Sequence, residues 1–481
     1  MLAVPGSGGP PRGRPGHTRR SIREVTTTAT PTSSPLGRGR FRRFLVDLTP
    51  LRLDRDYRRM WSGQVVSAIG NQVTRVALPF QVYTLTGSPL AIGILAGVQL
   101  VPILIFSLGG GAIADAMDRR RLLVFTTTGL AATSAVLAAL ALAPAPSVLV
   151  LYVVAFVASG LAAVDQPARS SSTPRLVPAE RLPAAIALAQ LNFQIASVLG
   201  PALGGIVIAA AGLPAAYAID VATFGASFVA VAGIAPLPPL GQVARPGIAA
   251  IREGLSFAWR RRAIAATFAI DLDAMIFGMP TSLFPVLALG VYHGGAAEVG
   301  LLNAAPAAGA LVGAALSGWI SGIRRPGRAT IIAVIGWGLA ITAFGLVPFS
   351  FALALLFLAI AGAADVLSAV FRSTIVQFET PDSLRGRVTA IHMLVVTSGP
   401  RMGDLEAAVV ATLVGAQASV VSGGLLCLAG VAAVARLFPE LGSYVSRVGA
   451  AAPARTAGTG EGTNGTTDGS ASSPDDEAVA V

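Results

Sequence analysis

Long apolar segments recur along almost the whole chain, and they restrict its fold more than any other feature. We count twelve, at 59–84, 91–116, 122–143, 147–166, 184–211, 214–235, 263–290, 298–322, 328–348, 350–371, 388–415 and 417–437. A helix of about 20 residues crosses a hydrocarbon layer roughly 30 Å thick. Backbone groups in lipid must bond to one another, and a helix achieves this within one segment. The pattern predicts an all-α polytopic membrane protein with twelve transmembrane helices.

The composition excludes an ordinary water-soluble enzyme. Hydrophobic residues make up 53% of the 481 residues and charged residues 12%, with a mean hydropathy of +0.70. A soluble domain carries roughly a quarter of its residues as charged side chains. Cys427 is the single cysteine, so no intramolecular disulfide can form. The three histidines are scattered, which predicts neither a metal site nor an enzyme active site.

The arginines alternate in step with the apolar segments. All 35 basic residues are arginine, and 33 of them gather in the first 59 residues, in every second loop and in the C-terminal tail; Arg75 and Arg401 lie inside apolar segments. The intervening loops contain no arginine; they lie near Thr86, Pro144, Pro214, His293, Pro348 and Gln417. Basic residues in short loops stay on the cytoplasmic side of a membrane. We therefore expect both termini in the cytoplasm.

A repeat divides the spans six and six. Arg169-Ser170 recurs as Arg372-Ser373, at an offset of 203 residues. An even number of spans between the copies keeps their orientation, so the halves are parallel repeats. We expect a disordered basic tail at 1–56, six-helix bundles at 57–235 and 263–438, and a second disordered tail at 439–481. Between the bundles, 236–262 is expected to be a cytoplasmic linker with an amphipathic helix on the membrane surface.

The basic turn after the second span carries a recognisable pattern. Its residues are Gly111, Asp115, Arg119 and Arg120. The turn resembles the gate motif of the major facilitator superfamily, in which an acid and the following basic residues hold the inner gate closed in one state. Ala116 stands where that motif has a basic residue, and Asp118 stands where it has glycine. The alternative is a plain topogenic turn.

A second pattern lies in the fifth span, at Gly200, Pro201, Gly204 and Gly205. It resembles the antiporter motif that exporters of the superfamily carry. Glycines let helices approach closely, and a proline bends the helix that contains it. Close helix packing without any transport role is the alternative interpretation.

Segments in the predicted cytoplasmic loops indicate a narrower group within the superfamily. They are Asp165–Arg169, Thr173–Pro178, Ala184–Ala187, Leu45–Leu48, Leu255–Ala258, Thr380–Pro381 and Leu384–Val388. In order and spacing they resemble the enterobactin exporter group, over about residues 44–437. The resemblance implies a proton-driven exporter of siderophores or hydrophobic drugs that uses no cofactor.

Ionisable and polar groups inside spans are expensive and therefore mark functional sites. The substrate-cavity candidates are Asn71, Gln72, Arg75, Gln81, Asp271 and Asp365. Proton coupling needs a buried carboxylate that can load and release a proton, and Asp271 and Asp365 are our candidates. Arg75 and Asp271 would form a natural charge pair across the halves. An arginine in the cavity suits an anionic or catecholate substrate, because its fork donates two hydrogen bonds.

Other intramembrane charges have uncertain roles: Asp220, Asp273, Arg401, Asp404 and Glu406. Arg401 and Asp404 are spaced so that they share a helix face and can satisfy each other. Asp273 is either a site residue or an interface carboxylate. Asp220 is expected to lie close enough to the outer surface to be hydrated. His392 is expected to be a hydrated histidine near a helix end.

Together these features predict a secondary active exporter of a bulky amphipathic small molecule, a siderophore first, exchanged for protons across the lipid bilayer. A multidrug or macrolide efflux pump is the alternative within this class. A non-transporting membrane sensor of the same fold is the alternative from another class. The chain has no lysine, so no phosphate-binding Walker motif exists and no nucleotide is implied. The basic tail is explained by membrane phosphates, so nucleic acid is not a predicted partner.

Overall fold

The computed structural model describes residues 47–239, 248–318 and 323–445, with the side chains of 107–116 and 248–251 left outside the description. Both predicted tails therefore lie largely outside the described residues. The short helix α1 (Thr49–Leu53) falls within the expected N-terminal tail. It begins there because Pro50 fits the first helical turn and the Asp47 carboxylate accepts hydrogen bonds from Thr49.

Helices account for the regular structure of the described ranges, with no strand among them. The first half contains α2 (Arg55–Thr86), α3 (Pro89–Ala116), α4 (Arg119–Leu142), α5 (Val148–Leu176) and α6 (Leu182–Ala232). The second contains α7 (Ile248–Arg260), α8 (Arg262–Phe277), α9 (Phe284–Gly290), α10 (Ala296–Ala315), α11 (Pro326–Gly345), α12 (Phe351–Glu379), α13 (Asp382–Val414), α14 (Ala416–Leu437) and α15 (Pro439–Ser443). The all-α prediction is confirmed for this part of the chain.

Nine helices in the described ranges are long and apolar enough to cross a membrane. Two expected spans fall together in α6, where Gly212 adopts a φ of 79° that breaks the helical path. The expected seventh span is interrupted between α8 and α9 by the short 3-10 helix η3 (Thr281–Leu283), which follows Pro280. The helices α2 and α13 are absent from the nine, and they carry the charged residues Arg75 and Arg401. The count of twelve spans stays a prediction.

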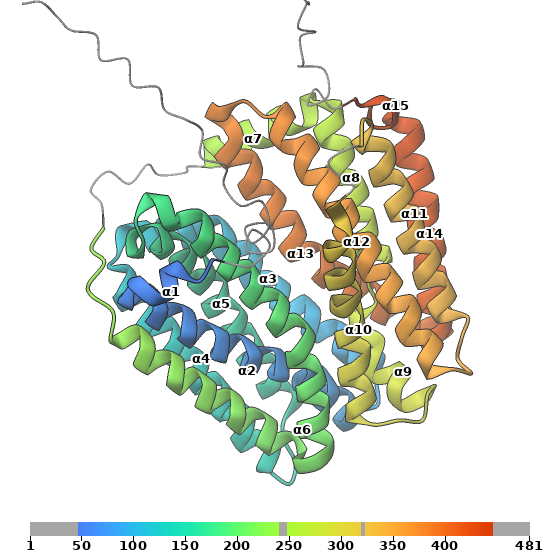
Figure 1. The fold of residues 1–481 in the computed structure, drawn as a ribbon. Coiled ribbons are helices and arrows are strands. Elements are labelled where there is room, and N and C mark those ends of the chain that lie inside the picture. The colour runs from blue at the N-terminus through green and yellow to red at the C-terminus, as the bar shows by residue number, and fades with distance from the viewer. Residues whose placement is uncertain (1–46, 240–247, 319–322, 446–481) are drawn as a thin grey trace, which may run out of the picture. The chain divides into compact units, whose positions relative to one another are not determined.

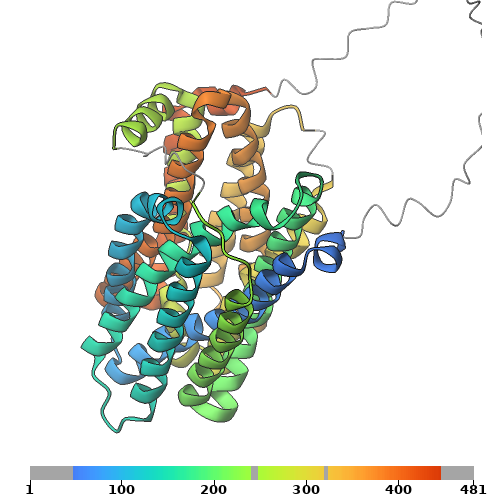
Figure 2. The same cartoon turned by 90° about the vertical axis from the view of Figure 1, so that its left-hand side faces the viewer.

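Two groups of packed helices form the described structure (Figure 1). In the first, α2 and α4 pack on α6, and α3 and α4 pack on α5. In the second, α11 packs on α12 and α14, α10 on α12, and α13 on α8 and α14. The groups meet through α3 with α13 and through α6 with α10. Figure 2 shows the same helices from the side. The candidate site residues lie on these packed helices.

The linker helix α7 packs against α8 and α13. Its Ala258 is 1% exposed and joins a small apolar cluster with Ile264, Val376 and Val388. An ion pair of 2.6 Å between Glu253 and Arg387 adds a polar contact to α13. The amphipathic helix predicted in the linker is thus present, with one face on the second helix group.

Candidate functional site

A buried arginine lies between two carboxylates in the second helix group. Arg372 of α12 places Nη1 2.8 Å from Oδ1 of Asp271 on α8, and Nη2 3.7 Å from Oδ1 of Asp365. The side chains of Arg372, Asp271 and Asp365 are 2%, 0% and 29% exposed. Arg372 therefore lies between a fully buried carboxylate, Asp271, and a partly accessible one, Asp365.

Helix register brings these groups together. Asp365, Ser368 and Arg372 recur at intervals of three and four residues on α12, which puts them on one helix face. On α8, Asp271 shares the buried face with Ala274, which is 0% exposed. Where α8 packs on α12, the two stripes meet. Local helical periodicity thus fixes the orientation of each group, and tertiary packing pairs them.

The cluster is incompletely hydrogen-bonded. Apart from the 2.8 Å ion pair between Arg372 Nη1 and Asp271 Oδ1, the Asp271 Oδ2, Arg372 Nε and Ser368 Oγ atoms have no hydrogen-bond partner among the described atoms. A buried ion pair compensates its desolvation fully only when hydrogen bonds satisfy the remaining polar atoms. The pair of Arg372 and Asp271 therefore compensates its desolvation only in part.

His392 of α13 borders this cluster. Its ring stacks on Phe268 with centroids 5.8 Å apart, and it interacts electrostatically with Asp271 and Arg372. The expectation of a hydrated helix-end histidine is wrong, because His392 is partly buried against the charge cluster. Sequence reasoning also missed Arg372 as a site residue. The signal was present, since Arg372 stands at the repeat position of Arg169.

The expected pairing of Arg75 with Asp271 is absent, because Asp271 pairs with Arg372. Arg75 interacts instead with the charges of Arg401 and Asp404 on α13. Both Arg75 and Asn71 have exposed side chains four residues apart on α2, so they form one accessible polar face. That this face lines a substrate cavity stays a prediction.

Two other cavity candidates make contacts within the first helix group. The Gln72 amide donates to the Ser197 hydroxyl at 3.5 Å. Gln81 is 2% exposed, and its Oε1 accepts a hydrogen bond of 2.7 Å from the Tyr217 hydroxyl. Gln81 therefore links α2 to α6 and is not one of the proposed substrate contacts.

The uncertain charges of α13 and α8 have local partners. Arg401 lies 3.8 Å from Asp404, as their spacing predicted. Asp404 also accepts hydrogen bonds from the Thr281 hydroxyl and the Ser282 amide, which fastens α13 to η3. Glu406 is half-buried on the same helix. On α8, Asp273 is hydrogen-bonded by the Cys427 thiol of α14 and lies at a helix interface.

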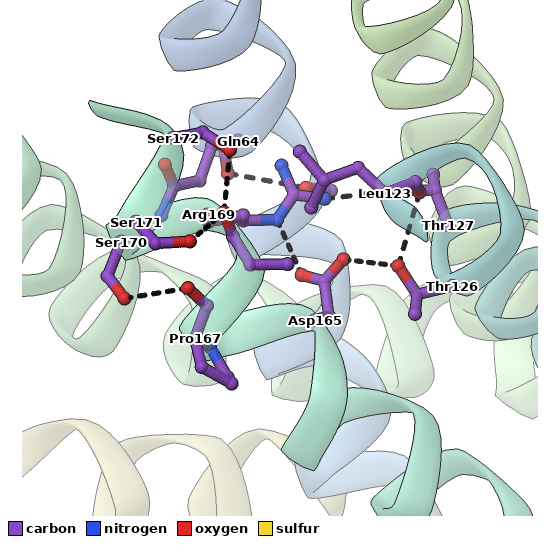
Figure 3. A network of polar contacts seen from close by, with 12 residues as sticks. Gln64, Leu123, Thr126, Thr127, Asp165, Pro167, Arg169, Ser170, Ser171 and Ser172 are labelled. Carbon is purple, nitrogen blue, oxygen red and sulfur yellow. Dashed lines mark hydrogen bonds and ion pairs between the residues drawn. The ribbon is translucent and has the colours of Figure 1, made fainter. Parts of the chain in front are cut away.

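The first helix group holds a buried arginine at the matching position (Figure 3). Arg169 of α5 donates from Nε to Asp165, one turn earlier on the same helix. The Thr126 hydroxyl donates to the other Asp165 oxygen at 2.6 Å, and Arg169 Nη2 donates to the Thr127 hydroxyl at 3.3 Å. Asp165 and Arg169 are 8% and 6% exposed. This pair is local and enclosed by hydroxyl groups.

The gate motif is described in part. Gly111 and Asp115 lie on α3, and their side chains are among those outside the description. Arg119 Nε donates to the Ser171 hydroxyl at 3.0 Å, and Arg120 Nη2 donates to the Ala232 carbonyl oxygen at 2.5 Å. Asp118, which replaces the usual glycine, accepts the Arg121 amide at 3.0 Å and caps α4. The contact expected between Asp115 and the arginines stays a prediction.

The antiporter motif lies where α6 crosses other helices. A Cβ at Gly200 would be 2.4 Å from Gln72 Cβ on α2, and one at Gly204 would be 3.0 Å from Val73 Cα. Pro201 and Gly205 contact α10 instead. A Cβ at Gly300 would be 2.6 Å from the Pro201 carbonyl oxygen, so only glycine fits this crossing. The motif thus packs α6 on α2 and on the second helix group.

Metal ligands do not gather in the described part of the chain, where no group of three or more His, Cys, Asp or Glu side chains is placed to hold an ion.

Comparison with known proteins identifies the family. Residues 46–447 match the family described as transmembrane secretion effector, a major facilitator group. The enterobactin exporter EntS of Citrobacter koseri is 27% identical over 368 residues, which cover 75% of this chain and 86% of that protein. The enterobactin exporter EntS of Shigella boydii serotype 18 is also 27% identical, with the same coverage.

Solved structures share the fold. A POT family transporter in complex with 5-aminolevulinic acid is 12% identical, with a TM-score of 0.65 over 81% of this chain and 97% of that chain. A bacterial homologue of the human lysosomal transporter Spinster, in an inward-facing conformation, is 15% identical, with a TM-score of 0.63 over 82% of this chain and 98% of that chain. The chain belongs to the transmembrane secretion effector family of the major facilitator superfamily, and it resembles enterobactin exporters.

Proposed function

We propose that the protein exports a siderophore-like amphipathic molecule across the bacterial cytoplasmic membrane in exchange for protons. The observation that carries the proposal is the cluster of Arg372 with Asp271 and Asp365, because one buried and one accessible carboxylate must share a single cation. The similarity to enterobactin exporters supports the substrate class. Twelve spans, with both termini in the cytoplasm, complete the proposed topology.

The coupling step follows from competition for Arg372. With both carboxylates ionised, Arg372 bridges Asp271 and Asp365. A proton that reaches the accessible Asp365 neutralises it, and Arg372 then pairs with Asp271 alone. Burial disfavours any unpaired charge, so a proton on Asp365 leaves the guanidinium to Asp271 alone. Proton binding thereby strengthens the ion pair between α12 and α8, because Asp365 and Arg372 both belong to α12.

Substrate contact is assigned to the polar face of α2. Asn71 and Arg75 are accessible there, and Arg401 of α13 is the nearby cation on the opposite half. A guanidinium donates two parallel hydrogen bonds to a carboxylate or a catecholate. An anionic ligand between Arg75 and Arg401 would also relieve the repulsion of two like charges. These features suit a catecholate siderophore better than a cationic drug.

The joints between the two halves support loading from the cytoplasm. One is the crossing of Gly300 with Pro201, and another is formed by Gly93, where a Cβ would be 2.5 Å from Ala408 Cβ. In the proposed topology these residues lie toward the outer ends of their helices. Contacts there close the cavity to the outside, as an exporter requires when it loads substrate.

Inside-out vesicles with an imposed proton gradient test the proposal. Enterobactin is the probe, and a macrolide is the competing substrate. We expect gradient-driven uptake of enterobactin, lost when Asp271→Asn and Asp365→Asn are combined. Asp382→Asn is the matched control, because Asp382 is 88% exposed in a surface pair with Arg385.

Unchanged uptake in the double variant would contradict the coupling assignment. Uptake of the macrolide in place of enterobactin would replace the siderophore with the drug-efflux alternative. A protein that binds enterobactin and moves neither compound would instead act as a sensor of the same fold.

A further inference from the structure

A carboxylate without a cationic partner lies inside the first helix group, away from Arg372. Asp220 of α6 is 1% exposed. Its Oδ2 accepts hydrogen bonds from the Thr74 hydroxyl of α2 at 2.6 Å and from the Ser134 hydroxyl of α4 at 2.7 Å. Three helices thus enclose the group, and the expected hydrated position near the outer surface does not fit this burial.

The second oxygen of Asp220 is unpartnered. Oδ1 has no hydrogen bond among the described atoms. It faces Gly70 of α2, where a Cβ would be 2.7 Å from Oδ1 and 2.0 Å from Thr223 Oγ1. The Thr223 hydroxyl donates to the Asp220 main-chain carbonyl at 2.8 Å and keeps a lone pair free. Oδ1 and Thr223 Oγ1 therefore share the small space left by Gly70.

The charged surroundings give Asp220 no counter-ion. The ion pairs found in the described part of the chain all involve other carboxylates. From α6 the titratable neighbour is Tyr217, whose hydroxyl donates to Gln81 at 2.7 Å. From α2 the nearest charge is Arg75, whose side chain leaves the helix about 100° away from that of Thr74 and is exposed. From α4 the contact is Ser134, a neutral hydroxyl.

An unpaired carboxylate in such a place favours its neutral form, because burial in a low-dielectric interior penalises an uncompensated charge. The hydrogen bonds leave one oxygen free to carry a proton. Oδ2 accepts two hydroxyl donors, whereas Oδ1 has no partner among the described atoms. The acid hydroxyl would then be on Oδ1, where a donor is free to reach Thr223 Oγ1.

We infer that Asp220 holds a proton on Oδ1 and is a second proton-binding site of this protein, separate from the cluster of Asp271, Asp365 and Arg372. In the step, Oδ1 takes one proton from hydronium and leaves water, and the carboxylate becomes a neutral acid. Thr74 directly precedes Arg75 on α2, so the same helical turn carries both residues. A shift of α2 on substrate binding would alter the bond between Thr74 and Asp220. That role in transport rests on the proposed function, whereas the bound proton does not.

Infrared difference spectroscopy of the full chain in lipid nanodiscs at neutral pH tests the inference. The difference between wild type and Asp220→Asn should contain the carbonyl band of a protonated carboxylic acid. Thr74→Val should move that band to higher frequency, because the acid carbonyl loses a donor. This second variant keeps the carboxylate, so the test survives if Asp220→Asn does not fold. Asp382→Asn is the control and should show no such band.

The inference is overturned if the acid band is absent from both difference spectra, that of wild type against Asp220→Asn and that of wild type against Thr74→Val. The measurement is repeated with sodium in place of potassium, and a band that vanishes in sodium would mean a sodium site and would also overturn it. The band does not depend on transport. If the protein exports enterobactin but the acid band is missing, this inference fails and the proposed function stands. If the band is present but the protein exports nothing, the proposed function fails and this inference stands.

Discussion

Two arginines at repeat-related positions are buried in different ways. Arg169 on α5 pairs with Asp165 of its own helix, and Thr126 and Thr127 add hydrogen bonds to the pair. Arg372 on α12 pairs with Asp271 of another helix and lies within ion-pair distance of Asp365. Asp271 Oδ2 has no hydrogen-bond partner in the described structure, and neither has Arg169 Nη1. The first pair is formed within one helix, and the second is formed between two helices.

The difference indicates a division of labour between the halves. A pair within one helix moves as a unit, so a change of conformation leaves it intact. A pair across α8 and α12 senses any relative movement of those helices, and an accessible third group, Asp365, lets a proton compete for the shared cation. The proposed function therefore assigns proton coupling to the cluster around the second arginine.

Removing Asp271 should have the largest effect. Asp271→Asn leaves Arg372 buried without its nearest carboxylate, and breaking a buried pair in this way costs about 3–5 kcal/mol. We expect lower thermal stability in detergent and no gradient-driven uptake. Adding Arg372→Gln removes the stranded charge and should restore stability but not uptake. Wild-type stability in the single variant would show that the pair is not a buried ionic contact.

Asp365→Asn should affect transport more than stability. The side chain is 29% exposed and 3.7 Å from Arg372, a distance at which a partly solvated pair contributes about 1 kcal/mol or less. We expect the rate of uptake to lose its dependence on the proton gradient while the melting temperature changes little. Vesicle uptake across a pH series measures the first, and thermal unfolding the second. An unchanged gradient dependence would exclude Asp365 as the proton acceptor.

Asp165→Asn tests the other member of the comparison. Arg169 keeps the Thr127 hydroxyl, and an asparagine still accepts from Thr126, so the loss should be about 1–3 kcal/mol. The rate of uptake should fall in proportion to the amount of protein that remains folded. Uptake should still depend on the proton gradient. If this variant folds and transports without a gradient requirement, the two clusters share the coupling role and the comparison fails.

The smallest effects concern two hydroxyls. Thr126→Val removes the 2.6 Å hydrogen bond to Asp165 and should cost about 1 kcal/mol. Ser368→Ala removes a hydroxyl that has no partner among the described atoms, so the free energy of unfolding should hardly change. Thermal unfolding of both variants under the same conditions measures the contrast. Equal losses would mean that the clusters are hydrogen-bonded to the same degree.

The sequence predicts the helical membrane fold because apolar length and loop arginines are local properties. It also singles out Asp271 and Asp365, since a carboxylate inside an apolar segment stands out. The partner of Asp271 was not predictable in the same way. Arg75 was the expected cation, and the packing of α8 on α12 supplies Arg372 in its place.

Other features of the site depend on packing alone. Gln81 is a polar residue inside an apolar segment, as a cavity residue would be. Its hydrogen bond with the Tyr217 hydroxyl nevertheless places it in the protein interior. His392 reaches the charge cluster because α13 packs beside α8. The pair of Asp165 and Arg169 is the exception, because a spacing of four residues on one helix suffices to predict their contact.

Proton release on substrate binding tests the central claim most directly. Enterobactin is added to the purified protein in weakly buffered detergent, and a pH-sensitive dye reports protons. We predict release by the wild type and by Asp165→Asn, and none by the combined Asp271→Asn and Asp365→Asn variant. Equal release from that double variant, in a protein that still binds enterobactin, would contradict the account.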